Sequence, residues 1–253
     1  MEDNFINNIH LHTIANLPTY LKDVGNIYPI LVKEICDIGE TEFYQTLYLL
    51  TGNENDFTDE QLEKNMTYFE YIIGICYNNE QVKNNVIKLL KYLFRKEITF
   101  YPSSFCFVVG DTNVNADEVK TIDEDNFCLF QDILRSQNRI KKKPYVQKPR
   151  QKFTKKQKEI LAKRKRGREA MARIHNKGQQ FYLVNIINNI SILYGDINKI
   201  LNLNFYQLNM QYEKYSQKER YDKDYQAYLV GADIKDLSIK TDWRTPIIEK
   251  EEE

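Results

Sequence analysis

Apolar side chains recur at helical spacing in three stretches of the first 100 residues. The segment "TEFYQTLYLLTG", residues 41–52, places Phe43, Leu47 and Leu50 on one side and meets a stop at Gly52. Residues 58–78 begin with Thr58, a good N-cap residue, followed by an acidic pair. Residues 79–97 carry a third apolar face made of Val82, Val86, Leu89, Leu90 and Leu93. We expect three helices that pack together through these faces.

The pattern then changes to one typical of strands. Residues 98–111, "ITFYPSSFCFVVGD", concentrate Phe, Val and Ile around a Pro-Ser-Ser turn, and "VNADEVKTID" follows after Gly110. This predicts a small β-hairpin or a three-stranded element near residues 97–120. Residues 123–140 return to a helical pattern, with acidic residues at the start and Arg139 near the end, as the helix dipole favours. Residues 1–140 are therefore predicted to form a helical domain with a small β insertion.

The C-terminal part is again helical. Residues 180–196 have apolar side chains at core spacing, namely Leu183, Ile186, Ile187, Ile190 and Leu193, and a short turn at 197–202 leads to a long aromatic stretch. At about 100° per residue, Phe205, Leu208, Tyr212 and Tyr215 cluster on one side, whereas Tyr221, Tyr225 and Tyr228 lie about a third of a turn away. Either the helix breaks near residues 218–220, or its second half meets a different partner from its first half. Gly231 is available as a left-handed cap.

A linker separates these two parts. Pro144 and Pro149 interrupt any helix across "KKKPYVQKPR", and a mostly polar helix capped by Thr154 is then expected to run until Gly178. The predicted fold is mainly α: a helical N-terminal domain, a basic linker with an exposed helix at 141–178, and a C-terminal long-helix region at 179–253. The acidic end "EKEEE" is predicted to be a solvated tail.

Charge is strongly segregated although the formal net charge is zero. Residues 139–177 hold seventeen Lys and Arg against two Glu, a local charge of +15, so the remaining chain carries −15. A basic stripe of this kind is typical of phosphate binding, and its candidate residues are Lys163, Arg164, Lys165, Arg166 and Arg168. The alternative is a solvated segment that docks on an acidic surface of this chain or of another copy.

Candidate catalytic chemistry is sparse. Cys36, Cys76, Cys106 and Cys128 are widely spaced among apolar neighbours, which predicts buried free thiols rather than a metal site. His10 and His12 alternate in "HLH", a pattern that places both rings on one side of an extended segment, yet no ligands of suitable spacing accompany them. No nucleophile motif, phosphate loop or dinucleotide turn is present, and no apolar run of about 18 residues could cross a membrane. We expect no enzyme, cofactor or metal, and a cytoplasmic protein without membrane contact.

Several of these segments resemble a family of tail-region proteins from tailed phages of Gram-positive bacteria. The likeness rests on "DEDNFCLFQDILRSQNRI", "KRKRGREAMARIHNK" and "NLNFYQLNMQYEKYSQKERYDKDYQAYLVGAD" with Trp243, together with the two earlier helical segments, and covers most of residues 30–243. Proteins similar to these are tail-assembly chaperones or tail structural proteins. The resemblance implies a host-cytoplasmic protein, retained in the virion if it is structural, whose partners are tape-measure or tube proteins or further copies of itself.

This resemblance gives the aromatic stretch a function. A tail chaperone must cover an amphipathic tape-measure protein, and aromatic side chains bury large areas with few rotatable bonds. The predicted partner-binding residues are Phe205, Tyr206, Leu208, Tyr212, Tyr215, Tyr221, Tyr225, Tyr228 and Trp243. Fold maintenance is the other interpretation of the residues that the resemblance singles out, and nucleic-acid binding by residues 139–177 is the alternative function.

Overall fold

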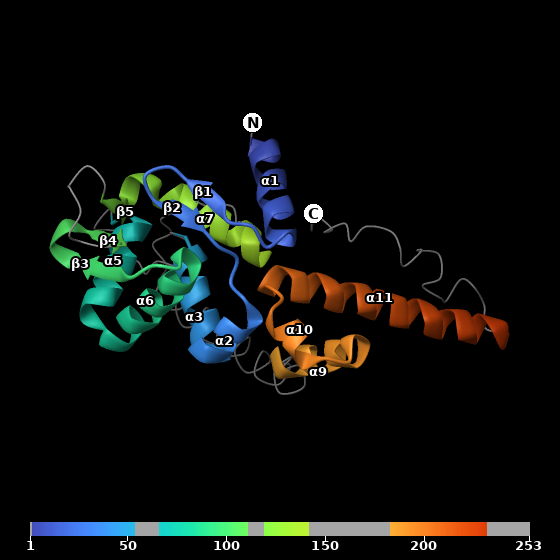
Figure 1. Cartoon of the computed structure of the whole chain (residues 1–253). Helices are drawn as coiled ribbons and strands as arrows, with labels where there is room; N and C mark the ends of the chain where they lie inside the picture. The colour runs from blue at the N-terminus through green and yellow to red at the C-terminus, as the bar shows by residue number, and fades with distance from the viewer. Residues whose placement is uncertain (1, 54–65, 111–118, 142–182, 232–253) are drawn as a thin grey trace, which may run out of the picture.

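The computed structural model describes residues 2–53, 66–110, 119–141 and 183–231, and this part of the chain is mainly helical (Figure 1). Its helices are α1 Glu2–Ile14, α2 Val32–Ile38, α3 Glu40–Thr51, α5 Tyr68–Asn78, α6 Glu80–Phe94, α7 Glu124–Asn138, α9 Leu183–Tyr194, α10 Ile197–Leu201 and α11 Phe205–Leu229. Its strands are β1 Thr19–Leu21, β2 Gly25–Ile27, β3 Ile98–Tyr101, β4 Cys106–Val109 and β5 Lys120–Ile122. The predicted fold class is confirmed.

Polar caps fix most of the helix starts. The Thr67 hydroxyl accepts a hydrogen bond of 3.2 Å from the Glu70 backbone N–H at the start of α5, and Asn79 accepts bonds from two backbone N–H groups of α6. Asp123 caps α7 in the same way through the Asn126 N–H at 3.3 Å. Each such cap supplies a partner to backbone donors that a helix terminus leaves open. The predicted cap Thr58 lies outside the described residues.

Two small antiparallel sheets accompany the helices. In the first, β1 pairs with β2, with Thr19 opposite Ile27. The second has the order β3-β4-β5, with Ile98 opposite Val109 and Phe107 opposite Ile122. This three-stranded sheet confirms the prediction near residues 97–120, whereas the hairpin β1–β2 lies in a part of the chain for which the pattern predicted no element.

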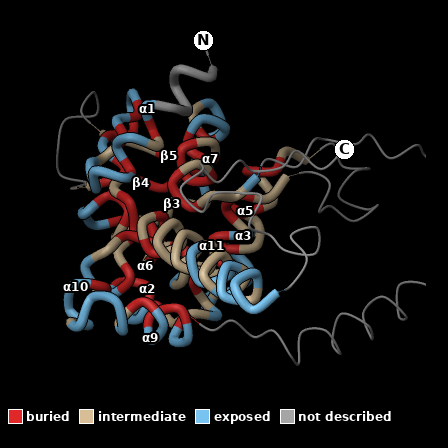
Figure 2. The backbone as a smooth tube through the Cα atoms, turned by 90° about the vertical axis from the view of Figure 1, so that its right-hand side faces the viewer, coloured by how far each residue is buried: buried red, intermediate tan, exposed pale blue. Residues whose placement is uncertain are grey.

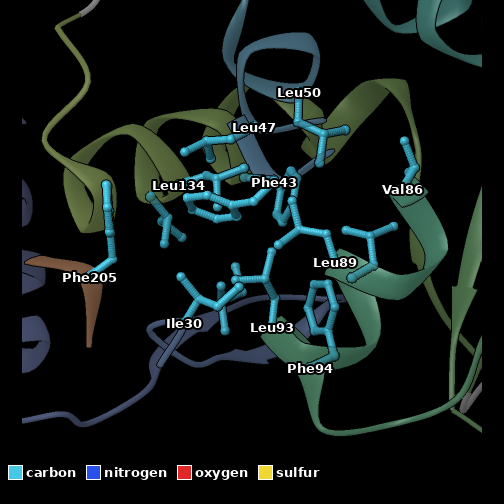
Figure 3. Close-up of a cluster of buried hydrophobic side chains, with 14 of the residues drawn as sticks. Ile30, Phe43, Leu47, Leu50, Val86, Leu89, Leu93, Phe94, Leu134 and Phe205 are labelled. Atoms are coloured by element: carbon cyan, nitrogen blue, oxygen red, sulfur yellow. The ribbon is translucent and has the colours of Figure 1, made fainter. Parts of the chain in front are cut away.

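One hydrophobic core joins the N-terminal and C-terminal parts of the described chain. Phe43 of α3, Leu89 and Leu93 of α6 and Leu134 of α7 are fully buried at its centre. Phe205, at the start of α11, packs into the same cluster (Figure 3). The apolar residues Leu183, Ile186, Ile187, Ile190 and Ile200 of α9 and α10 belong to it as well. Residues before and after the basic segment 141–178 therefore share one core.

Two expectations about side chains are wrong. Leu193 is 53% exposed rather than in the core, because α9 buries only one side and Leu193 lies beyond its last buried residue, Ile190. Of the four cysteines, Cys76 and Cys106 are buried as predicted, whereas Cys36 and Cys128 are exposed. All four thiols are free.

The histidine pair lies on a helix and not on an extended segment. In α1, the Nδ1 atom of His10 is 3.2 Å from the Tyr206 hydroxyl, and Nδ1 of His12 is 3.1 Å from the Pro18 carbonyl oxygen. Within the described ranges, no group of three or more His, Cys, Asp or Glu side chains is arranged to hold a metal ion. None of the described helices has the length and apolar character needed to cross a membrane.

Candidate interaction surface on the C-terminal helix

Helix α11 begins at a tightly bonded junction. The Asn204 side chain accepts a hydrogen bond of 2.8 Å from the Gln207 N–H, and the Gln207 side chain accepts one of 2.9 Å from the Asn204 N–H. The same Gln207 side chain donates to the Ile14 carbonyl at 2.8 Å. This reciprocal cap satisfies backbone donors at the helix start and ties the helix to the end of α1.

Backbone bonds to a distant segment set the direction in which α11 leaves the core. The Val32 N–H donates to the Leu203 carbonyl at 2.9 Å, and the Phe205 N–H donates to the Ile30 carbonyl at 3.0 Å. Leu31 and Asn204 thus form an isolated antiparallel bridge. Because these bonds link the backbone on both sides of Asn204, the first turn of α11 is held rigidly against the body.

The first aromatic residues of α11 serve the core. Phe205 and Tyr206 are 7% exposed and Leu208 is fully buried. The Phe205 ring meets the Phe43 ring edge-on at 5.4 Å between centroids. These three residues of α11 present almost no surface to a partner, which fits the fold-maintenance interpretation. Tyr212 and Tyr215 are partly buried and pack against the same core.

Beyond this junction α11 continues without a break to Leu229. Of the two alternatives that the sequence left open, the break near residues 218–220 does not occur. The second half of the helix extends away from the body (Figure 1), and its outer turns are exposed (Figure 2). We call residues 218–231 the distal arm. Among the described elements, those that pack against α11 are chiefly α1, α7 and α9, at the part that precedes the arm.

The distal arm exposes aromatic and aliphatic side chains. Tyr225 and Tyr228 are 47% and 44% exposed, and Leu229 and Val230 are 65% and 88% exposed. Tyr221 is partly buried and stacks on Tyr225, with centroids 6.3 Å apart and ring planes only 4° from parallel. The arm ends as predicted at Gly231, which has a φ of +100°.

Ion pairs between successive turns support the arm as a helix. Lys218 pairs with Asp222, and Lys223 pairs with Glu219 at 2.7 Å. Each pair has the four-residue spacing that brings side chains together on a helix surface. The arm is thus stabilised by local contacts, as a helix that leaves its own core requires.

A second exposed apolar area lies where α9 meets α10. Its members are Ile192 at 77%, Leu193 at 53%, Tyr194 at 37% and Ile197 at 50% exposed. We call these four residues the α9–α10 patch. Sequence reasoning missed Leu229 and Val230 in the arm and most of this patch, because an apolar residue near a helix end shows the same pattern whether it faces a core or solvent.

Three of the four thiols have a raised pKa. Burial raises the pKa of the Cys76 thiol to about 12, and burial also raises the pKa of Cys106. The pKa of Cys36 is raised as well, by partial burial and by the nearby Glu40 carboxylate. A thiol with a raised pKa holds little of the reactive thiolate near neutral pH.

Some predicted site residues lie outside the described residues. They are Trp243 in the C-terminal region and the basic residues Lys163, Arg164, Lys165, Arg166 and Arg168. The structure brings together Tyr221, Tyr225 and Tyr228 on the distal arm and separates them from the buried group at the start of α11.

The C-terminal part of the chain matches a known protein family. Neither the search of curated proteins nor the search of solved structures found a similar protein. Residues 175–247, which include α9, α10 and α11, match the model of the family described as the YomV second domain, and this family is phage-associated.

Proposed function

We propose that this protein acts in phage tail assembly, as a chaperone or as a structural component, by binding other proteins through the distal arm. One observation carries the proposal: α11 leaves the core as a continuous helix whose outer half exposes Tyr225, Tyr228 and Leu229. A helix end that contributes little to its own core, yet keeps aromatic side chains, is well suited to bury them against a partner.

Both the position of the family match and the chemistry of the exposed tyrosines support this proposal. The phage-associated match covers residues 175–247, so it includes the arm and the α9–α10 patch. Tyrosines combine a large apolar ring with a polar hydroxyl, which lets them lie in water before binding and become buried afterwards. The function that these features favour is binding of a protein helix or strand, with no chemical step.

The identity of the partner as a tape-measure or tube protein follows from the sequence resemblance. The alternative, nucleic-acid binding by residues 139–177, rests on their charge of +15 and stays a prediction. It predicts a distinct salt dependence, because the affinity of a protein that binds through many phosphate contacts falls steeply as the salt concentration rises.

The test is a pull-down with the tagged full-length protein from cells producing the phage, with and without nuclease. We expect tape-measure or tube proteins to be recovered in both halves, and to be lost with the double variant Tyr225→Ser and Tyr228→Ser. The matched control is Tyr20→Ser with Tyr77→Ser, which removes two tyrosines that are 62% and 70% exposed on the body. This control should retain the partners.

Two results would contradict the proposal. Recovery of tail proteins by the arm variant at the wild-type level would show that the arm is not the binding surface. Loss of all protein partners on nuclease treatment, with nucleic acid as the main bound material, would favour the basic segment instead.

A further inference from the structure

The charges of the distal arm are antisymmetric about Tyr221. The segment "KERYDKD", residues 218–224, has Lys218, Glu219 and Arg220 before the tyrosine and Asp222, Lys223 and Asp224 after it. Reversing the direction of this segment exchanges every positive position with a negative one. A helix with this property is complementary to an antiparallel copy of itself.

Helix geometry sorts these charges relative to the exposed tyrosines. At about 100° per residue, Lys218 and Asp222 lie about 60° and 100° to one side of Tyr221, and Arg220 and Asp224 lie at similar angles on the other side. Glu219 and Lys223 lie about 160° away, on the far side of the helix. Tyr225 and Tyr228 stay within about 40° of Tyr221, so the three tyrosines form one narrow stripe between two charged edges.

We propose that the distal arm pairs with the distal arm of a second copy of this chain, antiparallel and about a two-fold axis at Tyr221. In such an isologous pair the same side of both helices meets itself. Lys218 then lies close to Asp222 of the second copy, and Arg220 lies close to Asp224 of the second copy. Two-fold symmetry repeats each contact, so four intermolecular ion pairs flank the seam.

The tyrosine stripe fills the seam between these charged edges. Tyr221 meets its own symmetry mate, while Tyr225 and Tyr228 lie over the positions of Gln217 and Lys214 in the second copy. A tyrosine ring over the lysine stem and ammonium is a favourable cation–π contact. The seam therefore runs from residue 214 to residue 228 of each helix, and at 1.5 Å per residue it is about 20 Å long.

This inference rests on the proposed function, because it uses the same arm: a tail protein that binds the arm would compete with the second copy for the tyrosine stripe. Charge complementarity selects this occupant. A heterologous helix would need no antisymmetry in this sequence, whereas antisymmetric charges favour self-pairing about a two-fold axis.

The test is sedimentation velocity of the full-length protein over a range of concentrations. We expect a monomer–dimer equilibrium for the wild type. In a dimer of either single variant, Lys218→Glu or Asp222→Lys, positions 218 and 222 of the two copies carry like charges at both of their symmetry-related contacts. Each variant should therefore raise the dimer dissociation constant about tenfold. The double swap of both residues should restore it.

An equimolar mixture of the two single variants is the decisive sample. In the mixed dimer, the acidic group introduced at position 218 of one chain faces the basic group introduced at position 222 of the other, and the second contact on this edge keeps its native pair. Association should therefore return to within about threefold of the wild type, although each variant alone is weak.

The matched control is Lys223→Glu. It makes the same charge change and breaks the same kind of intrahelical pair, with Glu219, but on the far side of the helix. It should leave the dissociation constant unchanged.

Circular dichroism should show wild-type helicity for all of these variants. If a variant loses helicity, the mixing experiment is repeated with Arg220→Asp and Asp224→Arg, which change the other edge of the seam.

A monomeric wild type, or a mixture that associates as weakly as its components, would overturn the inference. If the protein is monomeric and still captures tail proteins, the proposed function stands without self-pairing. If it dimerises as described but captures none, self-pairing stands and the tail function fails.

Discussion

The side-chain nitrogen of Asn204 donates a hydrogen bond of 2.6 Å to the backbone carbonyl of Thr13. Asn204 is completely buried, and its side-chain oxygen accepts the Gln207 N–H at 2.8 Å. One amide group therefore caps α11 and fixes it to α1, 191 positions earlier in the chain. The direction of the distal arm depends on this residue.

Replacing Asn204 with Ala should lower the free energy of unfolding by about 1.5–2.5 kcal/mol. The loss combines an N-cap, worth about 1 kcal/mol, with the hydrogen bond to the Thr13 carbonyl, worth about 0.5–1.5 kcal/mol; this carbonyl keeps its bond of 3.1 Å from the Asn16 N–H. Chemical denaturation measures it. Asn209→Ala is the control, because Asn209 is on the same helix and bonds only to the local Phe205 carbonyl among the described contacts, at 2.9 Å. A change below about 1 kcal/mol at Asn204 would contradict the assigned role of this junction.

The four thiols should react at different rates in the folded protein. With iodoacetamide at about pH 8, near the ordinary thiol pKa, Cys128 should be alkylated first, because its side chain is exposed. Cys76 should be protected by both burial and a pKa raised to about 12, and Cys106 by burial and a raised pKa. Peptide mass spectrometry over time gives the order, and alkylation in denaturant should reach all four. Early modification of Cys76 would contradict the packing of α5.

Stability should decrease between about pH 10 and pH 12. Burial raises the pKa of Tyr44 to about 12, and the hydrogen bond of 2.6 Å that Tyr92 donates to Asp37 raises the pKa of Tyr92 to about 12. Because these folded-state values exceed the ordinary value of about 10, their stabilising contribution is complete below about pH 10 and is lost as the pH rises toward 12.

Denaturation at several alkaline pH values tests this linkage. Tyr92→Phe and Tyr44→Phe should each make stability less dependent on pH in that range, and Tyr20→Phe controls for the loss of one hydroxyl. An unchanged pH dependence in both variants would show that neither tyrosine is the source.

Much of the fold could be predicted from the apolar pattern. Phe43, Leu47 and Leu50 recur at helical spacing and are buried in α3, and the Pro-Ser-Ser turn correctly indicated the pairing of β3 with β4. These features are local, so a single segment carries the signal. The ends of α3 at Gly52 and of α11 near Gly231 also depend on nearby residues, so the sequence could predict them.

Long-range contacts could not be predicted in this way. Nothing near Asn204 in the sequence indicates Thr13, and the bridge from Leu31 to Asn204 depends on how the whole chain folds. The same holds for the candidate site. In the sequence, Phe205 and Tyr225 belong to the same aromatic helical pattern. Only the three-dimensional packing shows that Phe205 enters the core and Tyr225 does not.

A truncation series measures most directly whether the distal arm is the binding element. Three chains ending at residues 231, 217 and 182 are compared for cooperative unfolding and for capture of tail proteins in the pull-down. The chain ending at 231 should fold and bind. The chain ending at 182 should fail to fold, since it lacks the core residues Leu183, Ile190 and Leu208.

The chain ending at residue 217 decides the question. It keeps the buried first turns of α11 and loses only the arm and the residues after it, so it should unfold cooperatively like the chain ending at 231 and capture no tail protein. Capture at the level of the chain ending at 231 would contradict the account, because the partner would then bind a surface other than the distal arm.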